Sequence, residues 1–237
     1  MNRHSTELII ALDFPRADMA MELVKTLDVY PLIYKVGLEL FTVAGPEFVR
    51  NLVKQKKRVF LDLKFHDIPN TVAKAARQAA FLHVDFFTMH LTGGAAMLKA
   101  VAEELKDIPS LKPKMLGVSV LTSFDDMKWS EVTRAISLHA SQVSDSVDRL
   151  VDHYATSGID GVVCSAVELE MIKKKHPKLY TVVPGIRPAG VQLHDQARVV
   201  TPGEARNLGA DAIVVGRPIT ESPAPGLVVE SILKELV

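Results

Sequence analysis

Short runs of apolar, strand-favouring residues recur along the chain and alternate with longer segments whose apolar positions have helical spacing. The runs cover residues 8–12, 32–36, 59–63, 84–88, 115–120, 161–164, 180–183 and 212–215. Between most of them lie segments rich in Ala, Leu, Glu and Lys, such as 71–80, 95–105 and 141–156. Such composition and spacing favour helices. The pattern therefore predicts strands and helices in alternation.

The number of runs and their apolar character indicate the kind of sheet. Eight strand-helix units in 237 residues give about 30 residues per unit, the size of one strand, one helix and two short connections. Nearly continuous apolar strands are typical of parallel sheets covered by helices. We therefore predict an α/β fold, a single (β/α)8 TIM barrel domain over residues 1–237, with an open doubly wound sheet as the alternative.

The composition argues against several classes of function. Lys and Arg number 28, as do Asp and Glu, whereas binding to nucleic acid or an anionic membrane needs a basic excess or patch. The single cysteine, Cys164, excludes an internal disulfide and indicates a reducing compartment. Residues 1–7 are too polar for a signal peptide, and no run reaches the roughly 18 apolar residues of a membrane helix. We expect a cytoplasmic protein that acts on a small molecule, with no nucleic-acid or membrane partner.

Polar and charged residues close or follow most of the predicted strands. They are Asp13, Lys35, Asp62, Lys64, His90, Thr122, Ser123, Arg187, Gly216 and Arg217. In a barrel the carboxyl ends of the strands carry the active site, so these side chains are expected around one rim. Each alone has an ordinary interpretation as a capping or solvated residue. Together they indicate a ligand site, because clustered charges cost stability unless a ligand or pairing offsets the cost.

The third predicted strand carries the most informative motif, residues 62–71, DLKFHDIPNT. Strand alternation places Asp62 and Lys64 on the face that lines the barrel, with Leu63 on the other face. Carboxylates of Asp62 and Asp67 would then keep a buried Lys64 protonated. One interpretation is a structural network of ion pairs. The other is a protonated lysine that serves as a general acid.

The last two connections suggest a phosphate site. Gly216 allows backbone N–H groups to approach a phosphate, and Arg217 adds two aligned donors. Barrels frequently bind phosphate after their last strands, although a helix-start turn with a solvated arginine is the alternative. The seventh connection, residues 184–198, is long and contains glycines. We interpret it as a lid that brings Arg187 and Gln196 to the ligand.

Several motifs of other enzyme classes are absent from the sequence. It contains no GxGxxG, GxxxxGK[ST], CxxC or HExxH pattern, and residues 117–121 lack the second glycine of a nucleophile elbow. The histidines show no metal-ligand spacing, and a lysine between Asp62 and Asp67 would repel a cation. We therefore expect neither a metal nor a nicotinamide cofactor.

In these motifs the chain resembles the orotidine 5′-phosphate decarboxylases in their bacterial form. The segments that carry the resemblance are 11–13, 35–37, 62–71, 121–123, 184–187, 195–198 and 215–219. The Asp-x-Lys-x-x-Asp core is shared with sugar-phosphate decarboxylases of the same superfamily, whereas the extended motif and the last two connections are more specific. The resemblance implies conversion of orotidine 5′-monophosphate to UMP and CO2, the last step of de novo UMP synthesis, without a cofactor.

The resemblance also implies roles for residues near the reacting ring. Lys64 is expected to donate a proton to C6, flanked by Asp62, with Lys35 completing the charged array. Asp13 and Lys35 are expected to contact the ribose hydroxyls, and Thr122 the pyrimidine ring.

Further implied roles concern the phosphate and a second subunit. Asp67 and Thr71 resemble residues that the family contributes across a homodimer interface to the neighbouring active site. The residues expected to hold the phosphate and close the lid are Arg187, Gln196, Gly216 and Arg217.

Two other functions stay open at this point. A 3-keto-gulonate-phosphate or hexulose-phosphate enzyme reuses the Asp-x-Lys-x-x-Asp strand but stabilises an enediolate with a metal. A catalytically inactive barrel that binds nucleotides as a regulator or scaffold is the second, and the complete charged array argues against it.

Overall fold

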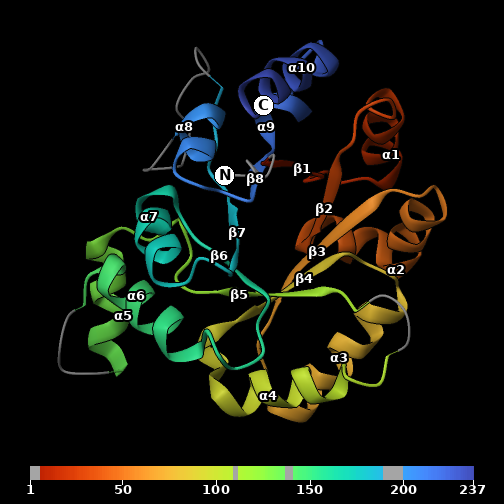
Figure 1. Ribbon diagram of the computed structural model, residues 1–237. Helices are drawn as coiled ribbons and strands as arrows, with labels where there is room; N and C mark the ends of the chain where they lie inside the picture. The colour runs from red at the N-terminus through yellow and green to blue at the C-terminus, as the bar shows by residue number, and fades with distance from the viewer. Residues whose placement is uncertain (1–5, 109–111, 137–140, 189–199) are drawn as a thin grey trace.

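Eight parallel strands close into a barrel in the computed structural model of the chain (Figure 1). The structure describes residues 6–108, 112–136, 141–188 and 200–237. The strands are β1 (Glu7–Ala11), β2 (Ile33–Gly37), β3 (Arg58–Phe65), β4 (Phe86–His90), β5 (Lys114–Val118), β6 (Gly161–Val163), β7 (Tyr180–Val183) and β8 (Ala212–Val215). Each strand pairs with the next, and β8 pairs with β1. The predicted (β/α)8 barrel is confirmed, and the alternative of an open sheet is wrong.

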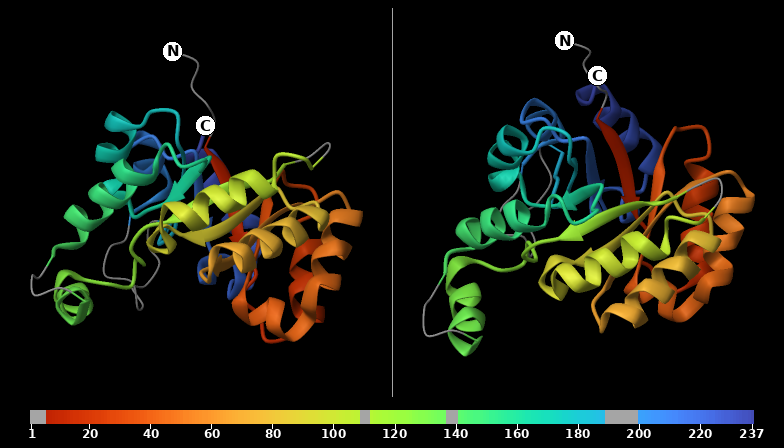
Figure 2. Two further views of the ribbon diagram at one scale, coloured as in Figure 1. Left: turned by 90° about the horizontal axis from the view of Figure 1, so that it is seen from below. Right: turned by 60° about the horizontal axis from the view of Figure 1, so that its bottom comes forward.

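Helices surround the strands, as the two further views in Figure 2 show. They are α1 (Ala17–Thr26), α2 (Leu38–Lys54), α3 (Pro69–Phe81), the short 3-10 helix η1 (Leu91–Gly93), α4 (Gly94–Glu104), α5 (Asp126–Ile136), α6 (Val143–Tyr154), α7 (Ala166–Lys175), α8 (Pro202–Asn207), α9 (Arg217–Thr220) and α10 (Pro225–Glu235). The helical segments expected over 71–80, 95–105 and 141–156 correspond to α3, α4 and α6. The connection from β5 to β6 carries a further helix, α5, in which Thr133 is buried while Met127 and Ile136 are exposed.

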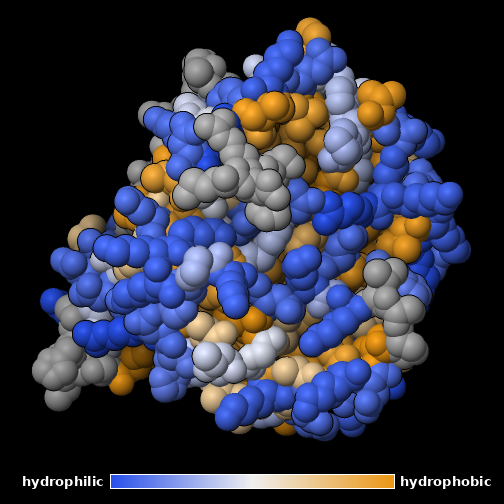
Figure 3. Space-filling model, in the orientation of Figure 1, coloured by the Kyte–Doolittle hydropathy of each residue, from blue (hydrophilic) through white to orange (hydrophobic). Residues whose placement is uncertain are grey.

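The outer surface is largely polar on the side seen in Figure 3. Hydrophilic residues cover most of that face, and hydrophobic residues show between them as separate areas. Among the described segments, none of the helices has both the length and the apolar character needed to cross a membrane.

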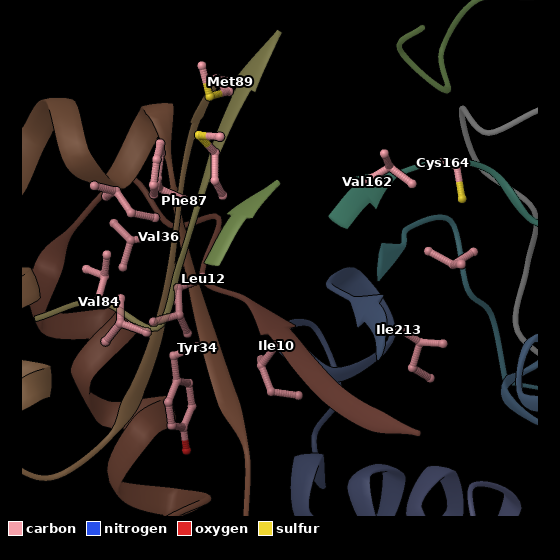
Figure 4. Packing of buried hydrophobic residues seen from close by; sticks show 14 of the residues in the cluster. Ile10, Leu12, Tyr34, Val36, Val84, Phe87, Met89, Val162, Cys164 and Ile213 are labelled. Atoms are coloured by element: carbon pink, nitrogen blue, oxygen red, sulfur yellow. The ribbon is translucent and has the colours of Figure 1, made fainter. Parts of the chain in front are cut away.

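Alternate residues of the strands build two separate apolar layers. The inner layer fills the barrel with Ile9, Ala11, Ile33, Phe60, Phe86, Leu116, Val182, Ala212 and Val214. Residues between these positions, such as Val36 and Phe87, belong to the layer that packs against the helices (Figure 4). Each such side chain contributes roughly 1.5–3 kcal/mol when it is fully buried. The alternation also determines which side chains reach the inside at the carboxyl ends of the strands.

Candidate active site

Charged side chains replace apolar ones where the inner layer reaches the carboxyl ends of the strands. Lys35 follows Ile33 by two residues on β2, and Asp62 and Lys64 continue the inner positions of β3 after Phe60. A cavity of about 130 Å³ opens at this end. Its lining consists of Lys35, Phe60, Asp62, Lys64, Val118, Val120, Leu121, Thr122, Val163, Pro184 and Val214. The structure thus brings four of the predicted site residues together.

Four of the charged groups alternate in sign along one line. Lys64 Nζ donates to Asp62 Oδ1 at 2.9 Å, and Asp62 Oδ2 lies 3.7 Å from Lys35 Nζ. Lys35 Nζ in turn donates to Asp13 Oδ1 at 3.0 Å. The inner members are largely buried, with 11% of the Lys35 side chain and 12% of the Asp62 side chain exposed, against 59% of the Asp13 side chain. Two carboxylates balance two ammonium groups, which lowers the cost of burying them.

Gly37 and Gly216 have no side chains, and this leaves room for the charged groups of the array. A Cβ on Gly37 would lie 2.9 Å from Lys35 Nζ and 3.3 Å from Asp13 Oδ1, and a Cβ on Gly216 would lie 3.4 Å from Ala11 Cβ. A side chain at position 37 would therefore displace the Lys35–Asp13 pair. Sequence reasoning placed Gly37 in a family motif but gave it no role, and its signal is a glycine at the end of a strand, two residues after a buried lysine.

A buried threonine that sequence reasoning missed also contacts the array. Thr88 lies on β4, and its hydroxyl donates to Asp62 Oδ1 at 2.9 Å and accepts from the backbone N–H of Lys64 at 2.9 Å. It is 1% exposed. Threonine is common in strands, so its residue type alone gave no signal of a role in a site.

Two histidines stand beside Lys64 at the rim of the barrel. The ring centroids of His66 and His90 are 5.2 Å apart. Burial, then the neighbouring His66 imidazole and the Lys64 ammonium, lower the pKa of His90 below its usual value of 6.5, while Asp62 opposes the shift. At neutral pH His90 is therefore mainly uncharged and adds little positive charge to the array.

The residues expected to cross a subunit interface stay outside the cavity of the single chain. Asp67 and Thr71 are exposed around the start of α3. Asp67 Oδ1 accepts a hydrogen bond from the backbone N–H of Ile68 at 2.6 Å. In the part of the chain that the structure describes, no ion pair joins Asp67 to Lys64.

Three of the four residues expected at the phosphate lie around the ends of β7 and β8. Arg187 is buried, its Nη1 donates to the Ile186 carbonyl at 3.1 Å, and its backbone N–H donates to the Val200 carbonyl at 3.0 Å. Gly216 follows β8, Arg217 begins α9, and both are half-buried. Gln196 and the rest of 189–199 lie outside the described residues, so the lid stays a prediction.

A bound metal ion needs a set of ligating side chains that lie close together. Across 6–108, 112–136, 141–188 and 200–237, no group of three or more His, Cys, Asp or Glu side chains is arranged to hold a metal ion.

The sequence matches one protein family over nearly its whole length. The family model described as "Orotidine 5'-phosphate decarboxylase / HUMPS family" matches residues 6–232.

Relatives of similar length were found by sequence and by structure. Orotidine 5'-phosphate decarboxylase of Legionella pneumophila (strain Corby) is 44% identical over 97% of this chain and 99% of its own, and that of Pseudomonas fluorescens (strain Pf0-1) is 42% identical over the full length of both. A crystal structure of orotidine 5'-phosphate decarboxylase from Lactobacillus acidophilus superposes with a TM-score of 0.84 at 35% identity, covering 98% of this chain and 99% of that one.

Proposed function

The chain belongs to the orotidine 5'-phosphate decarboxylase / HUMPS family, and from this membership we propose that it converts orotidine 5′-monophosphate to UMP and CO2 with Lys64 as proton donor. The resemblance drawn from the motifs is confirmed. Identity of 42–44% over nearly the whole length supports the decarboxylation itself, a step of pyrimidine biosynthesis. The observation that carries the residue-level proposal is the line of alternating charges from Lys64 to Asp13 at the carboxyl end of the barrel.

The chemistry of the substrate explains why a fixed ammonium is needed. When the bond between C6 and the carboxylate breaks, CO2 leaves and the electron pair stays on C6 in an orbital in the plane of the ring. The π-system of the ring does not delocalise that pair, so an adjacent positive charge must stabilise it. Lys64 supplies this charge and then transfers a proton to C6, which forms the C6–H bond of UMP. Solvent returns the proton to the lysine.

Asp62 makes a smaller contribution to the rate of decarboxylation. Its carboxylate would stand near the departing carboxylate of the substrate. Two like charges at about 4 Å interact by roughly 4 kcal/mol at an effective dielectric constant near 20. This equals a rate factor of about 10³, and it is an upper value because the substrate can shift to reduce the repulsion. The larger share then falls to Lys64 and to binding energy from the phosphate.

The cavity is too small to hold the whole substrate, so only one part of the substrate can enter it. A volume of about 130 Å³ is below the roughly 300 Å³ at which small-molecule pockets begin. The pyrimidine ring therefore occupies the cavity beside Thr122, and the ribose meets Lys35 at the cavity wall and Asp13 outside it. The phosphate then reaches the ends of β7 and β8, near Arg187, Gly216 and Arg217. Gln196 is the fourth residue assigned to it.

An absorbance assay with orotidine 5′-monophosphate and excess EDTA tests the activity. We expect the ultraviolet spectrum of the substrate to change to that of UMP at the same rate with and without EDTA, with release of one CO2 per UMP. A metal-assisted enzyme that acts on sugar phosphates through an enediolate would instead lose turnover in EDTA. Absence of UMP formation, together with metal-dependent turnover of a hexulose or keto-gulonate phosphate, would replace the proposal.

We also propose that the protein works as a homodimer in which Asp67 and Thr71 reach the active site of the other subunit. Both residues are exposed, and Ile68 between them is an apolar side chain with 67% exposure. All three positions are therefore accessible to a second copy of the chain.

Subunit mixing tests this sharing. Lys64→Ala and Asp67→Asn homodimers are each expected to be nearly inactive, because each carries its change in both sites. After equal mixing and random exchange, half of the dimers are hybrids with one intact site of two, so activity should recover to about a quarter of the wild-type value. Mixing Lys64→Ala with Asp62→Asn is the control and should recover nothing. No recovery in the first mixture, with exchange verified by mass spectrometry, contradicts the sharing.

A further inference from the structure

Lys64 has a backbone conformation that lysine seldom adopts. Its φ is 51°, in the left-handed region, which side-chain-bearing residues rarely occupy. The pairing of β3 with β4 is irregular at the same place, with a shift of register between Leu61 and Phe65. Such conformations persist at functional sites only where surrounding contacts hold them. A contact must therefore fix Lys64 in this bulge.

Thr88 makes that contact and closes a ring of hydrogen bonds. The backbone N–H of Lys64 donates to Thr88 Oγ1 at 2.9 Å, and Thr88 Oγ1 donates to Asp62 Oδ1 at 2.9 Å. Asp62 Oδ1 also accepts from Lys64 Nζ at 2.9 Å. An amide N–H can only donate, so the hydroxyl accepts there and has its own proton left for the carboxylate. The buried hydroxyl thus links the backbone N–H of Lys64 to the same carboxylate oxygen that the Lys64 ammonium contacts directly.

We propose that Thr88 is a positioning residue of the decarboxylation, which sets where the Lys64 ammonium stands through the bulge of β3 and the orientation of the Asp62 carboxylate. The inference rests on the proposed role of Lys64 as proton donor. With Oδ1 held by Thr88 and Lys64, Oδ2 is the oxygen directed to Lys35, at 3.7 Å. Without the hydroxyl, the Lys64 N–H loses its partner and the carboxylate is free to turn. A displacement of about 1 Å at a reacting group can lower the rate by about 10²-fold.

Another threonine makes the same pair of hydrogen bonds at the opposite end of the barrel and provides a matched control. Thr181, near the start of β7, is fully buried. Its hydroxyl donates to Asp211 Oδ2 at 3.0 Å and accepts from the backbone N–H of Asp211 at 3.2 Å. Substituting it removes a buried hydroxyl of the same kind without touching the cavity. The comparison therefore separates a loss of stability from a loss of positioning.

Steady-state kinetics of Thr88→Val, Thr88→Ser and Thr181→Val test the inference. Valine keeps the shape of threonine without the hydroxyl, and serine keeps the hydroxyl. For Thr88→Val we expect kcat to fall by about 10- to 100-fold with KM within about threefold of wild type, because the hydroxyl acts on the proton donor. Thr88→Ser should stay within about threefold of wild type, and Thr181→Val should keep kcat. An unchanged kcat in Thr88→Val, or equal losses in all three variants, overturns the inference.

Two further measurements keep the outcome clear. If Thr88→Val does not fold, Thr88→Cys replaces it, and its weak hydrogen bonding should give a kcat well below that of Thr88→Ser. A crystal structure of the valine or cysteine variant reports the φ of Lys64 and the distance from Nζ to Asp62 Oδ1 without need of turnover. Unchanged values of both overturn the inference. Failure of the proposed function shows separately, as a wild-type protein that forms no UMP.

Discussion

Replacing Lys64 by alanine is expected to lower kcat for orotidine 5′-monophosphate by at least about 10⁴-fold, because one side chain supplies both charge stabilisation and the proton. The barrel should still fold. Asp62 keeps the hydrogen bond from Thr88 at 2.9 Å and Lys35 at 3.7 Å, so its buried carboxylate is not left unpartnered. Single-turnover assays of UMP formation measure the rate, and circular dichroism measures the folded state.

The chain offers a control with the same substitution and the same backbone conformation. Lys56 has a φ of 58°, is exposed, and lies just before β3, at the other end of that strand from Lys64. Lys56→Ala therefore introduces alanine into the left-handed region without touching the array, and it should retain wild-type kcat. Substantial UMP formation by folded Lys64→Ala would show that the proton comes from another group.

Replacing Arg217 by alanine is expected to lower kcat/KM by about 10²-fold or more, equal to about 3 kcal/mol. A guanidinium beside the phosphate makes charge-assisted hydrogen bonds, and binding energy at this non-reacting group supports the chemical step at C6. Arg217 directly follows Gly216, next to the end of β1, so the proposed phosphate site is on the same rim as Asp13.

The nucleoside orotidine, which lacks the phosphate, shows whether the fall in kcat/KM of Arg217→Ala comes from lost contact with the phosphate. Its turnover should be the same in wild type and Arg217→Ala, whereas that of the phosphorylated substrate should differ. Arg149→Ala, an exposed arginine on α6, controls for general loss of positive charge and should match wild type with both substrates. A negligible change in kcat/KM for Arg217→Ala would show that the phosphate binds elsewhere on the rim.

The sequence predicted those features that depend on one strand at a time. Apolar runs bounded by polar residues located all eight strands, and the alternation of side chains placed Asp62 and Lys64 together on the inner face. Active-site residues of barrels lie at the carboxyl ends of the strands, and on this basis the sequence also placed Lys35 and Thr122 at one rim. Both residues line the same cavity.

Features that depend on how two strands meet were not predictable. Thr88 reaches Asp62 and Lys64 because of the local register between β3 and β4, and no single-strand pattern reports a register. Gly37 matters because Asp13 on the chain after β1 lies beside it.

The irregular pairing of β3 constrains how this strand can change in length. From Leu61 to Phe65 the strand advances four positions while its partner β4 advances two, from Phe87 to Met89. The excess is an even number, so side-chain parity is the same before and after the bulge, and Phe65 returns to the outer layer with Met89. Deleting one residue here would turn either Asp62 or Lys64 towards the helices. Insertions and deletions at this point are therefore compatible with the active site only in pairs.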